Sequence, residues 1–163
     1  MADGLMDRKV LFVDDEKDML KILFLCTGNS CRSQIAEGWA KQLKKDEIDA
    51  FSAGIEVNEL NANAVRVMQE VGIDISQARS KHVDDLKDIR FDYVVTVCDH
   101  ANEHCPIYLK ESTHVHAGFD DPPRLAKGAS TEEEALAHYR RVRDEIRRFV
   151  EALPENLGAQ KTY

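Results

Sequence analysis

Residues 26–33 read Cys26-Thr27-Gly28-Asn29-Ser30-Cys31-Arg32-Ser33 and directly follow an apolar run, Ile22-Leu23-Phe24-Leu25. The apolar run predicts a buried strand, and the spacing of apolar residues after Ser33 predicts a helix. The eight residues therefore connect a strand to a helix. Backbone N–H groups of such a loop can point at one centre, where the helix N-terminus adds partial positive charge. The sequence predicts an oxyanion-binding loop at this place.

Two side chains give the loop its chemistry. Arg32 can hold two oxygens of a tetrahedral anion through its guanidinium fork. Cys26 ends the strand, where the loop amides, the helix dipole and Arg32 favour its thiolate. A cysteine at a strand end is often only a small apolar residue, but the whole combination favours a nucleophile that ionises easily. The residues expected to bind the oxyanion are Thr27, Gly28, Asn29, Ser30, Cys31, Arg32 and Ser33.

Strands and helices are expected to alternate along the rest of the chain. Further strands are predicted at 50–54, 91–97 and 114–117. Helices are predicted after Ser33, from Asn61 or Asn63 to Gly72, at 83–86, and from a capping box of Ser130 and Glu133 to Leu153. This order predicts an α/β fold, a doubly wound four-stranded parallel sheet flanked by helices. Ligands bind beyond the strand ends of such sheets, where we expect Cys26, Ser52–Gly54, Cys98 and Gly118–Asp121.

The apolar faces of the three longest helices follow from the same spacing. The residues expected to face the core are Ala36, Trp39, Ala40 and Leu43 in the first helix, Val65, Met68 and Val71 in the second, and Tyr139, Val142, Ile146, Phe149 and Leu153 in the last.

Composition bounds the class of protein. The chain has 163 residues, 43% of them hydrophobic, which suits one globular domain. A net charge of −8 argues against nucleic acid as a partner, and no apolar run is long enough for a membrane span. Four cysteines are too few and too widely spaced for a secreted disulfide scaffold. Since no signal-peptide pattern is present, we expect a cytoplasmic protein that acts as a monomer.

The expected domain covers residues 19–154. Residues 1–18 include Lys9–Glu16, which resembles the opening strand and acidic pair of a response-regulator receiver domain. The remaining chain leaves no room for that domain, so we interpret 1–18 as an N-terminal extension of unknown role or an artefact of the gene start. Residues 155–163 are expected to form a C-terminal tail.

A second pair of cysteines, Cys98 and Cys105, is separated by seven positions. If this segment is helical, the separation corresponds to roughly 10 Å of rise, beyond the Cα distance of about 7 Å that a disulfide tolerates. The two residues could then bond only after the segment unwinds, which would make it a redox switch. Two other interpretations stay open. The cysteines with His100 and His104 include zinc ligands, although in no common zinc spacing, and both cysteines could be inert.

Residues 20–153 resemble the low-molecular-weight tyrosine phosphatase superfamily, especially its thioredoxin-coupled arsenate reductases. The resemblance rests on C-T-G-N-S-C-R-S-Q-I-A-E from Cys26, on V-V-T-V-C ending at Cys98, and on Cys105-Pro106. It implies that arsenate, with phosphate and sulfate as analogues, binds in the loop and that Cys26 attacks arsenic. Cys98 would then attack Cys26, releasing arsenite, and Cys105 would attack Cys98. Thioredoxin would reduce the final disulfide for arsenic detoxification, with no bound cofactor.

The resemblance also assigns supporting residues. Asp120-Asp121-Pro122 resembles the general-acid loop of the family, which makes Asp121 the expected proton donor and Asp120 the fallback. Family members can hold potassium through positions that match Asn29, Glu37 and Ser52. A further acidic position of that pattern corresponds to Lys81, whose ammonium could replace the cation. We therefore expect no metal and no potassium requirement.

Two alternative functions remain. A low-molecular-weight tyrosine phosphatase would hydrolyse phosphate monoesters through a Cys26 phosphoenzyme. Such enzymes place an aromatic residue after Asp-Pro, whereas Pro123 and Arg124 follow Pro122 here, so we expect only weak phosphatase side activity. The other alternative is a non-enzymatic oxyanion sensor, or a fusion-derived regulator that uses residues 1–18, which an unreactive Cys26 would favour.

Overall fold

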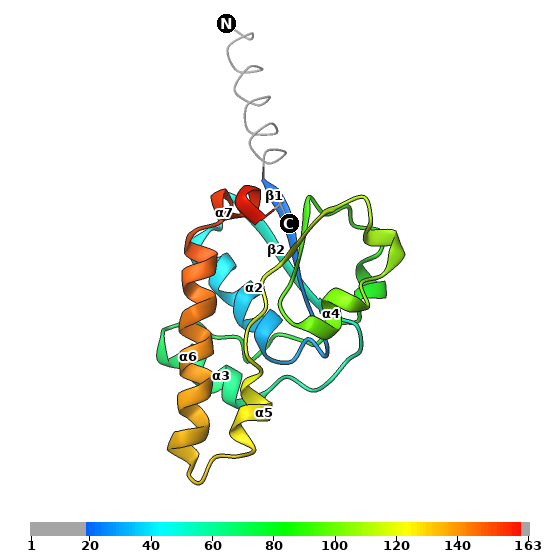
Figure 1. Ribbon diagram of the computed structural model, residues 1–163. Helices are drawn as coiled ribbons and strands as arrows, with labels where there is room; N and C mark the ends of the chain where they lie inside the picture. The colour runs from blue at the N-terminus through cyan, green and yellow to red at the C-terminus, as the bar shows by residue number, and fades with distance from the viewer. Residues whose placement is uncertain (1–18, 161–163) are drawn as a thin grey trace, which may run out of the picture.

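The computed structural model describes residues 19–160, which are shown in Figure 1. Four parallel strands form one sheet in the order β2-β1-β3-β4. The strands are β1 (Leu20–Cys26), β2 (Ile48–Gly54), β3 (Tyr93–Thr96) and β4 (Thr113–His116). The predicted α/β class and parallel sheet are confirmed. Strand β3 is shorter than its predicted range of 91–97, and β4 is shifted towards the N-terminus from its predicted range of 114–117.

Helices cover both faces of the sheet. On one face α2 (Arg32–Leu43) packs against α3 (Ala62–Glu70) and α6 (Glu132–Glu151), while α4 (Asp99–Glu103) lies on the other (Figure 1). Residues Ile22–Leu25 of β1 are completely buried between these layers, as a central parallel strand requires. The remaining elements are η1 (Val83–Leu86), η2 (Ile107–Leu109), α5 (Pro122–Ala126) and α7 (Glu155–Gln160).

The helix ends follow the predicted signals with one shift. Asn61 caps α3 by accepting a hydrogen bond from the backbone N–H of Ala64 at 3.0 Å, and Gly72 follows the helix with a left-handed φ of 84°. The capping box predicted for the last helix is wrong by one residue. Thr131 is the N-cap and accepts from the N–H of Glu134, whose carboxylate accepts from the N–H of Ser130.

The predicted apolar faces are correct except at four places. Leu43 ends α2 with 37% of its surface exposed, and in α3 Val67 is fully buried beside Met68, whereas Val65 and Val71 are only half-buried. In α6 the stripe is confirmed except at Phe149, which is half-buried, and it also includes Leu136 and Val150, which are fully buried.

The C-terminal limit of the domain lies beyond the predicted residue 154. Residues Glu155–Gln160 form α7 rather than a tail, and Leu157 is fully buried in the core. A tail cannot supply a core residue, so the packed domain includes this helix. The extension predicted at 1–18 lies outside the described residues. Within residues 19–160, no helix has the length and apolar character needed to cross a membrane.

Candidate active site

Residues 26–33 form the predicted loop between β1 and α2, at the carboxyl edge of the sheet. The carbonyl oxygens of Cys26–Ser30 all accept hydrogen bonds from groups outside the loop, which are the N–H groups of Ile55, Glu56, Asn58 and Asn61 and the hydroxyl of Ser80. In a trans peptide the following N–H points the opposite way. Five consecutive N–H groups, of Thr27–Cys31, are therefore turned away from these partners. This is the geometry of an oxyanion cradle.

A cavity of about 240 Å³ opens at this loop. Its lining includes most of the residues predicted to bind an oxyanion, but Asn29 and Ser33 are completely buried behind the loop. Asn29 has a left-handed φ of 52°, and its amide donates to the hydroxyls of Ser33 and Ser52 at 2.9 Å each. Asn29 and Ser33 therefore support the loop from the side opposite the cavity. The cavity is lined by Cys26, Thr27, Gly28, Ser30, Cys31, Arg32, Asn58, Asp121 and Pro123.

Arg32 lies with its guanidinium at the cavity. One terminal nitrogen donates to the carbonyl of Phe119 at 2.9 Å, and the other lies 3.7 Å from a carboxylate oxygen of Asp121. Its Nε is buried and, among the described residues, has no hydrogen-bond partner. Because a buried donor without a partner is costly, this atom fits a site whose ligand is an anion.

Cys26 and Cys98 lie close enough for each thiol to shift the pKa of the other. The sulfur of Cys98 accepts from the backbone N–H of Ala101 at 3.4 Å and lies 3.2 Å from the hydroxyl of Thr27. The interaction with Cys26, together with these two contacts, lowers the pKa of Cys98 to about 5. The same interaction, together with burial, raises the pKa of Cys26 well above its ordinary value despite Arg32. This arrangement favours the thiolate on Cys98, whereas the loop pattern alone indicates Cys26.

Cys98 is the N-cap of α4, so the segment between Cys98 and Cys105 is helical only over five residues. Cys105 follows this helix, is half-buried, and has its sulfur 3.7 Å from Nδ1 of His114. Burial raises the pKa of the Cys105 thiol to about 11. Both cysteines are free. Cys31 is also free, and burial raises its pKa to about 12, which makes it unreactive at neutral pH.

The two acidic candidates lie in different surroundings. Asp121 lines the cradle cavity and a neighbouring cavity of about 560 Å³ that also includes Cys98 and Arg124. Asp120 is 63% exposed and forms an ion pair with Arg141 at 3.0 Å. A proton donor must reach the leaving oxygen, and this geometry favours Asp121.

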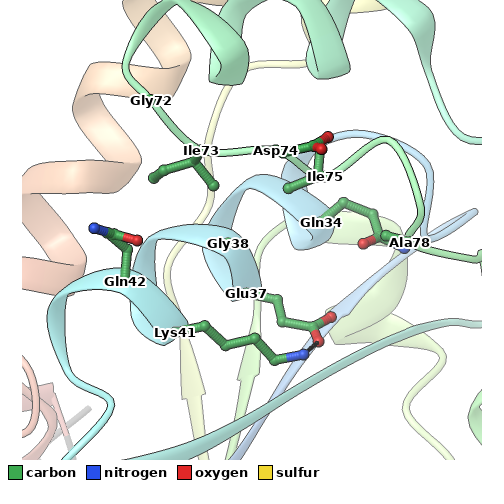
Figure 2. A pocket seen from close by; sticks show the side chains of 10 residues that line it. All are labelled: Gln34, Glu37, Gly38, Lys41, Gln42, Gly72, Ile73, Asp74, Ile75 and Ala78. Atoms are coloured by element: carbon green, nitrogen blue, oxygen red, sulfur yellow. Dashed lines mark ion pairs between the residues drawn. The ribbon is translucent and has the colours of Figure 1, made fainter.

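The residues matched to a potassium site form a hydrogen-bonded chain. Asn29 bonds to Ser52, whose hydroxyl donates to Glu37. Lys81 donates through its backbone N–H to Asn29 at 2.8 Å and through Nζ to the carbonyl of Arg79 at 3.0 Å. Glu37 also pairs with Lys41 at the edge of a cavity of about 370 Å³ beside α2 (Figure 2). Within residues 19–160, no group of three or more His, Cys, Asp or Glu side chains could hold a metal ion.

Two contacts important to the cradle were not expected from the sequence, which placed Gly54 near the site without this role and did not indicate Asn58. A Cβ on Gly54 would lie 2.7 Å from the carbonyl oxygen of Thr27 and 2.8 Å from the nitrogen of Asn29, so only glycine allows β2 to approach the loop. Asn58 covers Gly28, where a Cβ would lie 2.1 Å from the Asn58 amide nitrogen. Both follow from tertiary contacts, for which the sequence carries no local signal.

Comparison with known proteins places this site in a family. The model of the family "Low molecular weight phosphotyrosine protein phosphatase" matches residues 21–162. The chain is 54% identical over 125 residues to the arsenate reductase of Bacillus subtilis, which covers 77% of this chain and 88% of that protein. It is 51% identical over 134 residues to the arsenate reductase of Halalkalibacterium halodurans, and this match covers 82% of this chain and 94% of that protein.

Solved structures give the same result. The fold is similar to an arsenate reductase in the phosphate binding state, with a TM-score of 0.70 and 32% identity over 86% of this chain and 98% of that chain. An arsenate reductase in the oxidized state gives a TM-score of 0.70 and 31% identity, covering 85% and 99%. A tyrosine phosphatase from Erwinia amylovora shares the fold alone, at 17% identity over 85% and 93% of the two chains and a TM-score of 0.63.

Proposed function

The chain belongs to the low-molecular-weight phosphotyrosine protein phosphatase family, and we propose that it is an arsenate reductase working through Cys26, Cys98 and Cys105. The observation that carries this proposal is the position of Cys98 at the oxyanion loop, where its sulfur lies 3.2 Å from the hydroxyl of Thr27, the residue next to Cys26. A phosphatase needs only the cysteine in the loop. A second, easily ionised cysteine close to the first suits a reaction that ends in a disulfide.

The first step is nucleophilic attack on arsenate. The N–H groups of Thr27–Cys31 and the guanidinium of Arg32 hold the oxyanion, and the sulfur of Cys26 bonds to arsenic. The Cys26 proton and an arsenate oxygen leave as water, with Asp121 as the group that delivers a proton to this oxygen. Arsenic remains As(V) in the covalent adduct.

The second step reduces arsenic. Cys98 as thiolate attacks the sulfur of Cys26, the S–As bond breaks, and its electron pair stays on arsenic, which leaves as arsenite, As(III), and takes up protons from water. A Cys26–Cys98 disulfide remains. Cys105 then attacks Cys98, which frees Cys26 and forms the Cys98–Cys105 disulfide. Because Cys105 lies beyond the end of α4 and faces His114, this last exchange requires α4 to unwind.

Reducing equivalents come from outside the domain. We propose that thioredoxin reduces the Cys98–Cys105 disulfide by thiol–disulfide exchange, and that the enzyme needs no bound cofactor and no metal. Glutaredoxin is the alternative reductant. A cycle of this kind needs a compartment in which thiols are kept reduced, which is why we assign the protein to the cytoplasm, as a monomer that detoxifies arsenic.

Arsenate-dependent NADPH oxidation with thioredoxin and thioredoxin reductase tests this function. We expect continuous turnover by the wild type and none by Cys98→Ser. Failure of the wild type to turn over arsenate, with hydrolysis of an aryl phosphate intact, would instead assign the protein to the phosphatases. Pro123 and Arg124, rather than an aromatic residue, follow Asp121-Pro122, so we expect aryl phosphate hydrolysis to be weak.

A further inference from the structure

Two histidines lie together on the helix that carries Cys98. His100 and His104 are four positions apart on α4, which places them on the same face. Their rings are stacked with centroids 4.3 Å apart and an interplanar angle of 25°. Both side chains are exposed, and His100 also lines the cavity of about 560 Å³ that includes Cys98.

The hydrogen bonding of His104 prepares one ring nitrogen for coordination. Its Nδ1 lies 2.9 Å from the backbone carbonyl oxygen of His100. A carbonyl oxygen can only accept, so Nδ1 carries the proton and Nε2 of the neutral ring keeps its lone pair. Bonding one imidazole nitrogen to a carbonyl is how proteins commonly fix a metal-binding histidine.

The spacing of the two rings suits a small divalent ion. Metal–nitrogen bonds of about 2.1 Å need ligand nitrogens roughly 3 Å apart, so the two exposed rings have to rotate out of their stack until both lone pairs point at one ion. Imidazole pairs suit zinc, nickel and copper. Since no third His, Cys, Asp or Glu converges on the pair within residues 19–160, water would complete the coordination sphere.

We propose that His100 and His104 form a two-histidine site for a divalent transition metal ion, and that an ion bound there holds α4 in its helical form. The two side chains lie side by side only while α4 is a helix. The backbone N–H of His104 donates to the same His100 carbonyl at 3.1 Å, so unwinding would break both bonds and separate the rings. A ligand that binds only one of two states shifts the equilibrium towards that state.

The consequence for catalysis rests on the proposed function. The sulfur of Cys98 already lies at the loop of Cys26, 3.2 Å from the hydroxyl of Thr27, so arsenite release and the first disulfide need no unwinding. Transfer of the disulfide to Cys105 requires α4 to unwind. At a metal concentration of 100 times Kd, the unwound population and the rate of this transfer should fall about 100-fold. The metal would thus stop the relay at the Cys26–Cys98 disulfide.

Titration of the reduced protein with Ni²⁺ alone tests the site without arsenate. We expect His100→Ala and His104→Ala each to raise the apparent Kd at least about tenfold, whereas His138→Ala, which removes a histidine from α6, leaves it unchanged. Amide exchange of Ala101–His104 should slow when Ni²⁺ binds. Equal binding by all four proteins, as thiol coordination would give, would overturn the proposal, and so would unchanged exchange.

A single turnover with arsenate and no reductant tests the consequence. With Ni²⁺ the wild type should release one equivalent of arsenite and accumulate Cys26–Cys98, and His100→Ala should proceed to Cys98–Cys105. Inhibition that is the same in His100→Ala would contradict the role of the histidine pair. If neither protein releases arsenite even without Ni²⁺, the failure belongs to the proposed function, and the binding titration still decides the site.

Discussion

The neighbouring thiols of Cys26 and Cys98 decide the reactivity of the site at the scale of single residues. Cys98 accepts from the backbone N–H of Ala101 at 3.4 Å and lies 3.2 Å from the hydroxyl of Thr27. The interaction with Cys26 and these two contacts lower the pKa of Cys98, while the same interaction and burial raise the pKa of Cys26. We therefore expect the second nucleophile to ionise first. The residue pattern of the loop indicates Cys26 instead, because a local pattern cannot include a cysteine that lies 72 positions away.

Removal of Cys98 should change how Cys26 titrates. The bond with Cys98 is the largest cause that raises the Cys26 pKa, so Cys98→Ala should lower that pKa and let Cys26 ionise at lower pH. Thiolate absorbance near 240 nm against pH measures this. The wild type should show one thiolate forming near pH 5, from Cys98, and the variant should lack that step. A step near pH 5 that persists in Cys98→Ala would contradict the assignment.

Replacing each carboxylate by an amide distinguishes Asp121 from Asp120 as the proton donor. Asp121→Asn should lower kcat for arsenate reduction about 10²- to 10⁴-fold, because the leaving oxygen loses its proton donor. Asp120→Asn is the matched control, since this exposed carboxylate pairs with Arg141 and does not line the cavity at Cys26, and it should change kcat less than about threefold. Steady-state kinetics at saturating arsenate decide the case, and a larger loss in Asp120→Asn would reverse the assignment.

At the scale of elements, short segments were predicted less well than long ones. The long apolar periods of α2, α3 and α6 indicated their positions correctly. The start of α6 was misplaced because Ser130 with Glu133 and Thr131 with Glu134 both fit a capping box. The structure decides between the two pairs, because the N–H of Glu134 donates to the Thr131 hydroxyl and the N–H of Ser130 donates to the Glu134 carboxylate.

The cap of α6 gives a prediction with a built-in control. Thr131→Ala should lower the free energy of unfolding by about 1 kcal/mol, because the N–H of Glu134 loses its acceptor. Ser130→Ala keeps the backbone N–H of residue 130 and should change the free energy of unfolding by less than about 0.5 kcal/mol. Urea unfolding of the two variants checks this, and a larger effect at Ser130 would restore the capping box predicted from sequence.

For the whole molecule, the parallel order of strands and the gathering of reactive residues at their carboxyl ends followed from sequence. Apolar strands alternating with amphipathic helices leave few other topologies. The contribution of α7 did not follow, because this six-residue helix supplies one core residue, Leu157, among those whose burial is described. The need for glycine at position 54 depends on a loop from another part of the chain and is equally invisible in a local pattern.

Leu157 tests whether α7 is part of the domain. Leu157→Ala should cost about 2–5 kcal/mol of unfolding free energy, because it leaves a cavity in the core. Leu43→Ala makes the same chemical change at a residue that is 37% exposed and should cost less than about 1 kcal/mol. Similar small values for both would mean that 155–160 behaves as the tail predicted from sequence.

The most direct test of the relay is one turnover of Cys105→Ser with arsenate and no reductant, followed by mass-spectrometric mapping of disulfides. We predict one equivalent of arsenite per protein and a Cys26–Cys98 disulfide, because the first disulfide involves only Cys26 and the neighbouring Cys98 and only the last exchange needs Cys105. Release of no arsenite, or arsenite without this disulfide, would contradict the three-cysteine mechanism.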